Sequence, residues 1–339
     1  MSVQVRPNGL LTYTDRDENQ TDTDNLQAGR EKLTRSGYTG DMSTKAVSKV
    51  KKYVTNWVTA LNAQNGQPFA QMEAQAKRLR FVTLTLPASQ RHSDNELKRV
   101  FSTWFMVLLK RRYGVESYLW RAETQKSGGL HFHVLIDRPV PHLALRRIWN
   151  SCIEPLGYIQ RYRENQEAWH SNGFRARPEL FKQWDIRKQK AAYLHGKETN
   201  WAQPNTTDIH ALQNVKNVVS YVVKYVSKNS PTRKVEGRLW GCSDDLRALE
   251  RFVVQEDAEL LQLLSKAVED GEAKLSSGDG WSFYTCDTAT LLEKWFPGCS
   301  DLFVSHWQTQ AAKLSGSPYI SKYFTSTKPP PCTKTKLST

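Results

Sequence analysis

The sequence lacks three features that would each place it in a familiar class. No hydrophobic run among its 339 residues is long enough to cross a membrane, and the first 24 residues are too polar for a signal peptide. No G-x-x-x-x-G-K-[S/T] loop is present, so we expect no ATPase or helicase activity of its own. The five cysteines lack C-x-x-C spacing, which predicts reduced thiols in a cytoplasmic protein rather than a zinc site or a disulfide framework.

Positive charge, by contrast, is abundant. The chain carries 48 Lys and Arg against 34 Asp and Glu, which gives a net charge of +14 and a pI of about 9.5. Such an excess predicts a polyanionic partner, nucleic acid before a membrane surface. The charge alone does not distinguish a DNA-modifying enzyme from a non-catalytic basic DNA-binding protein.

Composition and periodicity divide the chain into five segments. They are a flexible polar arm (1–44), a basic amphipathic helical segment (45–76), a central domain (77–242), a mostly helical C-terminal subdomain (243–324) and a disordered tail (325–339). The helix predicted at 44–62 carries a stripe of Val and Trp. It either packs on the central domain or lies along DNA, and the stripe favours packing.

The central domain is predicted to mix strands and helices. We expect strands at 81–87, 117–123, 130–137, 158–163 and 206–212, and helices at 93–113 and 142–156. Ser93 or Asp94 should cap the first of these helices, with Trp104 among its core residues. This order predicts an α+β fold: one open antiparallel sheet with helices mainly on one face. Beyond it, we predict a long helix at 244–271.

The strand predicted at 130–137 organises the candidate site. Side chains two apart share a face of a strand, so one face is apolar and the other carries His131 and His133. A Gly-Gly pair marks a hairpin turn before this strand. A three-residue loop there would set Glu123 opposite His131 or His133. The result is a candidate divalent-metal site, with Asp137 as the next candidate for third ligand and an exposed polar face as the alternative.

A second pattern lies at 218–228. Its β-branched residues suggest a strand, but the spacing of Tyr221, Lys224, Tyr225 and Lys228 fits a helix better. At about 100° per residue, these four side chains fall within one arc, and valines fill the opposite side. The helix either presents two phenols and two amines to a ligand, or it is an ordinary amphipathic helix with half-buried tyrosines.

Together these blocks resemble the HUH endonucleases, and among them the two-tyrosine rolling-circle replication initiators (Rep) of single-stranded-DNA phages and plasmids. Residues 81–87 resemble the first motif of that family. Glu123 with residues 131–133 resembles its metal motif, and residues 221–225 resemble its two-tyrosine motif. Residues 237–241 are similar to a segment that often follows in phage initiators. The blocks span about half of the chain, in the order of the family.

The resemblance implies a ferredoxin-like sheet and metal-dependent, sequence-specific nicking of single-stranded origin DNA. Nicking would proceed through a covalent 5′-phosphotyrosine, with later strand transfer or rejoining. The implied catalytic residues are Tyr221, Tyr225, Lys224 and Lys228. The implied metal ligands are Glu123, His131 and His133. The implied cofactor is Mg²⁺ or Mn²⁺, although Zn²⁺ also accepts such a ligand set.

The expected partners are single-stranded DNA at a replication origin and a host helicase and polymerase, in the cytoplasm of a bacterial host and away from any membrane. Two alternatives stay open: an HUH transposase or mobilisation relaxase, and a non-catalytic basic DNA-binding protein. DNA contacts are expected at Lys110, Arg111, Arg112 and Arg238. Trp120, Trp184 and Trp201 either stack on bases or pack in the core, and packing is favoured for each.

Overall fold

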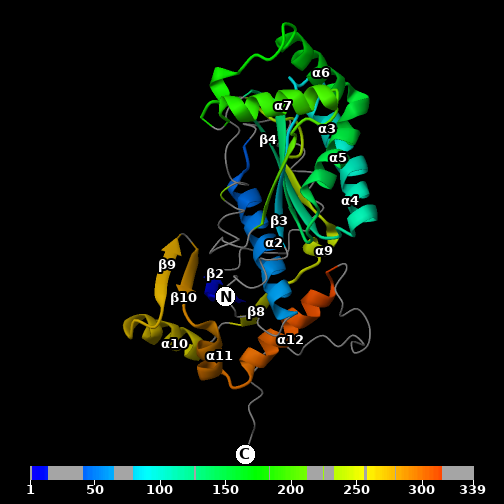
Figure 1. Ribbon diagram of the computed structural model, residues 1–339. Coiled ribbons are helices and arrows are strands. Elements are labelled where there is room, and N and C mark those ends of the chain that lie inside the picture. The colour runs from blue at the N-terminus through cyan, green and yellow to red at the C-terminus, as the bar shows by residue number, and fades with distance from the viewer. Residues whose placement is uncertain are drawn as a thin grey trace, which may run out of the picture.

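The fold contains two five-stranded antiparallel sheets (Figure 1). The structure, a computed structural model, describes residues 2–13, 41–64, 79–125, 127–182, 184–211, 233–255, 258–278 and 280–314, together with Lys224. None of the helices in these residues is both long and apolar enough to span a membrane. The mixed architecture with antiparallel sheets confirms the predicted α+β class.

One of the two sheets, here called the central sheet, is built from the middle of the chain. Its strand order is β6 (Thr207–Ala211), β3 (Arg80–Leu84), β5 (Leu130–Ile136), β4 (Tyr118–Thr124) and β7 (Trp240–Cys242). Alternate residues of β5 face a helical layer, and Phe132, Val134 and Ile136 are buried in that core. The apolar face predicted for this strand is therefore confirmed.

The helical layer lies along one face of the central sheet (Figure 1). It comprises α3 (Asp94–Val100), a π-helical turn (Phe101–Phe105), α4 (Met106–Tyr113), α5 (His142–Ile153), a 3₁₀ turn (Glu154–Leu156) and α6 (Tyr158–Trp169). Ser93 caps α3 in a reciprocal capping box with Glu96.

The π-helical turn overturns one core prediction. Trp104 is 46% exposed, whereas Met106 and Leu109 are buried. A π turn inserts an extra residue into the helical repeat, so the buried stripe beyond Phe101 shifts by one position. Regular helical periodicity could not anticipate that shift.

The strand predicted at 158–163 is wrong, because this segment forms the start of α6. Its polar and apolar residues alternate over a few positions, which suggests a strand. However, Tyr158 and Ile159 are both buried while Gln160 is exposed. Two adjacent buried positions fit one face of a helix, and six residues were too few to separate the two periods.

Helix α2 (Thr44–Ala63) covers part of the opposite face of the central sheet. Its Val and Trp stripe is buried, with Trp57 fully inaccessible, and this stripe shares a core with Phe81, Leu119 and Leu135 of the central sheet. The prediction that this helix packs on the domain is confirmed. The remainder of this sheet face carries the polar residues described below.

The other sheet joins the two ends of the described chain. Its strand order is β8 (Phe252–Gln255), β1 (Ser2–Arg6), β2 (Gly9–Tyr13), β10 (Trp281–Thr285) and β9 (Lys274–Gly278). Residues 2–13 thus form a hairpin, which corrects the prediction of a flexible arm for this stretch. At Gly9 the backbone has φ +151°, and a Cβ would lie 2.1 Å from the carbonyl oxygen of Tyr284, so only glycine fits.

The single long helix predicted at 244–271 is also wrong. The segment contains a short helix α9 (Asp244–Arg247), strand β8 and helix α10 (Ala258–Glu269). Phe252 and Val254 are buried while Val253 and Gln255 are exposed, because β8 pairs with β1. Its partner strand lies almost the whole chain away, so local periodicity could not reveal the pairing. Helices α11 (Thr288–Trp295) and α12 (Cys299–Ala312) follow, and α12 packs on α2.

Candidate metal centre

The hairpin of β4 and β5 brings the predicted ligands together. The amide of Gln125 donates to the carbonyl of Gly129 (2.8 Å), and Gly128 adopts φ +82°. This is the three-residue loop expected from the glycines, closed by a residue in the left-handed region. The resulting register places Glu123 directly opposite His131. The hairpin prediction is confirmed.

Glu123, His131 and His133 form a compact cluster on the sheet face that α2 leaves uncovered. One ligand atom from each lies within 4.8 Å of the other two, and Glu123 Oε1 lies 2.8 Å from His133 Nε2. Asp137, the alternative third ligand, is not part of this cluster. One carboxylate and two imidazoles at this spacing fit a divalent cation with positions left open for a substrate.

Neighbouring side chains fix both imidazole rings. The Nδ1 atom of His133 lies 3.2 Å from the hydroxyl of Thr83, and its ring stacks on Phe81 with centroids 5.3 Å apart. The Nδ1 atom of His131 lies 2.9 Å from the side-chain amide of Gln125. Partners at Nδ1 orient metal-binding imidazoles and set their tautomer.

The electrostatics of the cluster also suit a cation. Burial, together with the neighbouring His133, lowers the pKa of His131 to about 4, so this imidazole is neutral at pH 7. Burial alone would raise the pKa of Glu123, but the hydrogen bond with His133 and nearby positive groups outweigh it and lower that pKa. A neutral imidazole and an ionised carboxylate are the protonation states that metal ligands require.

The predicted catalytic tyrosines are not within the structural description. Tyr221, Tyr225 and Lys228 lie outside the described residues, and Lys224 is described only as exposed. The description resumes at Arg233, five residues after Lys228. The contacts of Arg233 therefore show where the chain returns to the domain after the two-tyrosine segment.

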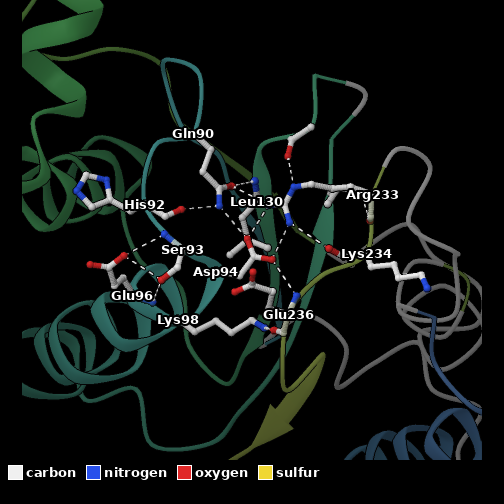
Figure 2. A network of polar contacts seen from close by, with 12 residues as sticks. Gln90, His92, Ser93, Asp94, Glu96, Lys98, Leu130, Arg233, Lys234 and Glu236 are labelled. Carbon is white, nitrogen blue, oxygen red and sulfur yellow. Dashed lines mark hydrogen bonds and ion pairs between the residues drawn. The ribbon is translucent and has the colours of Figure 1, made fainter. Parts of the chain in front are cut away.

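Arg233 is held by a polar network, here called the Arg233 clamp (Figure 2). Its guanidinium donates two hydrogen bonds to the carboxylate of Asp94, at 2.6 and 2.7 Å, and a third to the carbonyl of Gly128, at 2.8 Å. Gln90 donates to Asp94 (2.8 Å), and its side-chain oxygen accepts from the amide of Leu130 (2.6 Å). The clamp thus ties the exit of the two-tyrosine segment to the metal hairpin and to the start of α3.

The carboxylate of Asp94 is the centre of the clamp. It is fully buried, and it also accepts a hydrogen bond from the amide of Glu236 at 2.9 Å. Burial alone would raise the pKa of Asp94, but the hydrogen bonds from Arg233 and Gln90 outweigh it and lower that pKa. The stabilisation is therefore complete above the pKa of the unfolded carboxyl group, and it is lost as the pH falls through the lowered folded pKa.

We expect Asp94→Ala to lower the free energy of unfolding by about 3 kcal/mol, because it leaves Arg233 and Gln90 without their shared acceptor. Urea denaturation followed by tryptophan fluorescence measures the change. Ser93→Ala is the matched control: it removes only the cap of the same helix and should cost about 1 kcal/mol. Equal losses in the two variants would show that Asp94 acts as a local helix residue and not as the centre of a clamp.

The predicted DNA-binding residues lie away from the cluster. Lys110, Arg111 and Arg112 end α4, next to the start of β4, whereas Glu123 lies near the end of that strand. Lys110 forms an ion pair with Glu116 at 2.6 Å. Arg238 is exposed beside β7. Their role in DNA binding stays a prediction.

Three contributions to the site were missed in the sequence. Thr83 faces His133 only because β3 pairs with β5 in that register, which the sequence does not reveal. Gln125 had a usable signal, since the alternation that places Glu123 on the metal face also places Gln125 there. The Arg233 clamp had none, because its members are separated by more than 130 residues.

The fold and the cluster define an antiparallel α+β domain that holds a potential divalent-metal site on one face of its sheet. Comparison with known families is more specific. Residues 79–230 match the family described as replication-associated protein ORF2. The match covers somewhat under half of the chain, and it contains both the cluster and the two-tyrosine segment. It confirms the resemblance of this domain to replication initiators of the Rep type. No curated protein and no solved structure shows significant similarity to the chain.

Proposed function

We propose that the protein initiates rolling-circle replication by nicking single-stranded origin DNA through a covalent 5′-phosphotyrosine intermediate. The observation that carries the proposal is the convergence of Glu123, His131 and His133 in a domain of replication-associated type. The two-tyrosine segment follows in the same matched range. The net charge of +14 agrees with a nucleic-acid substrate.

The chemistry follows from the groups that the chain supplies. Glu123, His131 and His133 would hold Mg²⁺ or Mn²⁺, and the bound cation would neutralise charge on the non-bridging oxygens of the scissile phosphate. The fit of this site rests on its oxygen-plus-imidazole donors and their protonation states. His133, fixed by Thr83 and Phe81, and His131, fixed by Gln125, keep the donors in place between turnovers.

The nucleophile is a tyrosine phenol that loses its proton. The phenolate oxygen of Tyr221 or Tyr225 attacks phosphorus, and the bond from phosphorus to the 3′ oxygen breaks. The 3′ oxygen takes up a proton and leaves as a free 3′-OH, while the 5′ phosphate stays on the tyrosine. Lys224 and Lys228 would lower the phenol pKa and contact the phosphate. The phosphodiester is exchanged and not hydrolysed, so the reverse reaction rejoins the strand without ATP.

The same proposal sets the partners and the location. Because the sequence contains no P-loop, unwinding and synthesis would need a helicase and a polymerase of the host. We accordingly place the protein in the cytoplasm of a bacterial host cell. Two tyrosines would let one hold the first 5′ end while the other cuts again, as termination of a rolling circle requires.

A denaturing gel tests the proposal. The protein is incubated with single-stranded DNA containing the origin and with Mn²⁺, denatured, and examined for a species that carries both protein and DNA. We expect a covalent adduct that disappears with EDTA. A protein that binds the DNA but never forms an adduct is a non-catalytic DNA-binding protein, and the proposal is then wrong. Circularisation of the released strand distinguishes an initiator from a transposase.

We expect Glu123→Ala to raise the Mn²⁺ concentration for half-maximal adduct formation at least about tenfold, because the cluster loses its only carboxylate. Excess Mn²⁺ should restore part of the activity. Asp137→Asn is the matched control, since this carboxyl group lies on the same strand face outside the cluster. An unchanged Mn²⁺ titration for Glu123→Ala would show that the third ligand lies elsewhere.

A further inference from the structure

A cavity of about 420 Å³ lies between α6, α7 (Ile186–Glu198) and the loop that follows α7. We call it the aromatic cavity. Its walls are the rings of His170, Phe174, Tyr193 and Trp201, and the side-chain amides of Gln166 and Asn205 also line it. Among the described residues, these rings belong to neither of the two hydrophobic cores. They are only partly buried, so packing in a core does not account for them.

The rings form a stacking platform. His170 and Trp201 are nearly parallel, with an interplanar angle of 8° and centroids 6.5 Å apart. His170 and Phe174 are 15° from parallel at 6.1 Å. Tyr193 lies beside both, 4.6 Å from His170 and 6.4 Å from Trp201. Parallel, partly exposed rings of this kind offer π faces to a planar ligand.

The backbone is strained to hold Trp201 there. Asn200 and Trp201 have φ +49° and +46°, and no other non-glycine residue among those described has a positive φ. Two consecutive left-handed residues, one of them bulky, are costly and persist only where the surroundings enforce them. The amide of Trp201 donates to the carbonyl of Gly196 (2.8 Å). A Cβ at Gly196 would lie 2.2 Å from the indole nitrogen, so glycine is needed at this contact.

The surroundings of the aromatic cavity are basic. Residues 158–205 contain nine Lys and Arg against five Asp and Glu. Arg175 and Arg177 line the cavity and stack on Trp169, 4.2 and 4.6 Å from its ring centre. The side-chain amides of Gln166 and Asn205 form no hydrogen bond with any other described residue. The cavity therefore combines flat aromatic faces, cations for a phosphate and amides for the edge of a heterocycle.

The aromatic cavity also lies at the metal-bearing end of the central sheet. Asn205 in its wall precedes Thr206, whose carbonyl accepts hydrogen bonds from the amide and the hydroxyl of Thr85, at 2.8 and 3.2 Å. Two residues earlier along the chain, Thr83 contacts His133. Figure 1 shows α6 and α7 together over one end of the sheet. A strand crossing the metal cluster can therefore extend toward the cavity.

We propose that the aromatic cavity binds an unpaired base of the single-stranded DNA substrate and so helps to position the strand for nicking. The inference rests on the proposed function and adds to it a base-binding site remote from the reacting phosphate. The base stacks on Trp201 and His170, the amides of Gln166 and Asn205 contact its edge, and Arg175 and Arg177 contact the adjoining phosphate.

The test is equilibrium binding in EDTA, where no cleavage occurs. Fluorescence anisotropy compares a labelled single strand of mixed sequence, about 20 nucleotides long, with an abasic strand of the same length. The wild-type protein should prefer the strand with bases. Trp201→Ala and Tyr193→Ala should each weaken binding of that strand about tenfold, the order of stacking on one aromatic ring. Binding of the abasic strand and the salt dependence, which report phosphate contacts, should not change.

Phe181→Ala is the matched control, because this ring is 50% exposed in the same region but does not line the cavity. It should bind like the wild type. Circular dichroism verifies that the variants fold, and Tyr193→Ala decides the outcome if Trp201→Ala does not fold. Wild-type preference for bases in both cavity variants overturns the inference.

The covalent adduct with Mn²⁺ separates this result from the proposed function. If the wild type forms the adduct but the cavity variants bind normally, the base site is wrong and the nicking function stands. If the variants lose base preference but the wild type forms no adduct on origin DNA, the nicking function fails and the base site stands.

Discussion

Replacing both Tyr221 and Tyr225 by phenylalanine should abolish the covalent adduct with DNA completely. Phenylalanine keeps the ring but removes the oxygen that would bond to phosphorus, so no other step of binding should change. The variant should still bind single-stranded DNA and Mn²⁺ with wild-type affinity. Labelled DNA on a denaturing gel measures the adduct, and anisotropy measures binding.

The single variants divide the roles of the two phenols. At helical spacing Tyr221 and Tyr225 are one turn apart, and each has a lysine three residues later, within contact distance on a helix. Tyr221→Phe and Tyr225→Phe should therefore each retain some single-round cleavage of a short oligonucleotide. Both should fail to release a closed circle, because that reaction needs a second cut while the first 5′ end is still held.

Peptide mapping of the adduct provides the decisive control for this prediction. We expect DNA on Tyr221 in one population and on Tyr225 in the other. Tyr113→Phe, at the end of α4 and far along β4 from Glu123, should behave as the wild type in every assay. DNA found on one tyrosine alone, with the other single variant competent in circle release, would show that the second phenol has only a structural role.

The sequence predicted the metal hairpin because every determinant of it is local. The alternation of β5, the left-handed Gly128 and the spacing from Glu123 to His131 all lie within a single hairpin, residues 118–136. The second sheet could not be predicted in the same way. Strand β8 owes its conformation to β1, at the other end of the chain, and the local sequence resembled a continuation of a helix.

Two errors have a smaller physical scale. The π-helical turn at 101–105 shifts the buried stripe by one residue and exposes Trp104. Trp120 and Trp201 were both expected to pack, and Trp120 does, against Phe101 and Phe132. Trp201 instead lies in the wall of a cavity, because two left-handed residues turn the chain after α7. Backbone conformations of this kind leave little trace in composition.

The other large effect is expected at the metal cluster. His131→Ala should lower metal-dependent adduct formation by about 10³-fold, since a metal that polarises a phosphate contributes several kcal/mol to the barrier. The fold should survive, because His131 is half-exposed on the face opposite the helical core. His133→Ala should lose the same activity, and it should also lose some stability, because its buried ring stacks on Phe81.

A measurement without DNA separates lost metal binding from lost positioning of the tyrosines. A cation that binds only the folded protein raises the melting temperature, so Mn²⁺ should stabilise the wild type and leave His131→Ala unchanged. His142→Ala is the matched control: this half-buried imidazole contacts the carbonyl of Thr207 at 3.2 Å, at the same end of the sheet but outside the cluster. It should keep both the Mn²⁺ shift and the adduct. If His131→Ala and His133→Ala retain the Mn²⁺ shift and undiminished cleavage, the cation lies elsewhere. The three side chains would then be a hydrogen-bonded polar face, held together by the 2.8 Å contact between Glu123 and His133 and not by a metal.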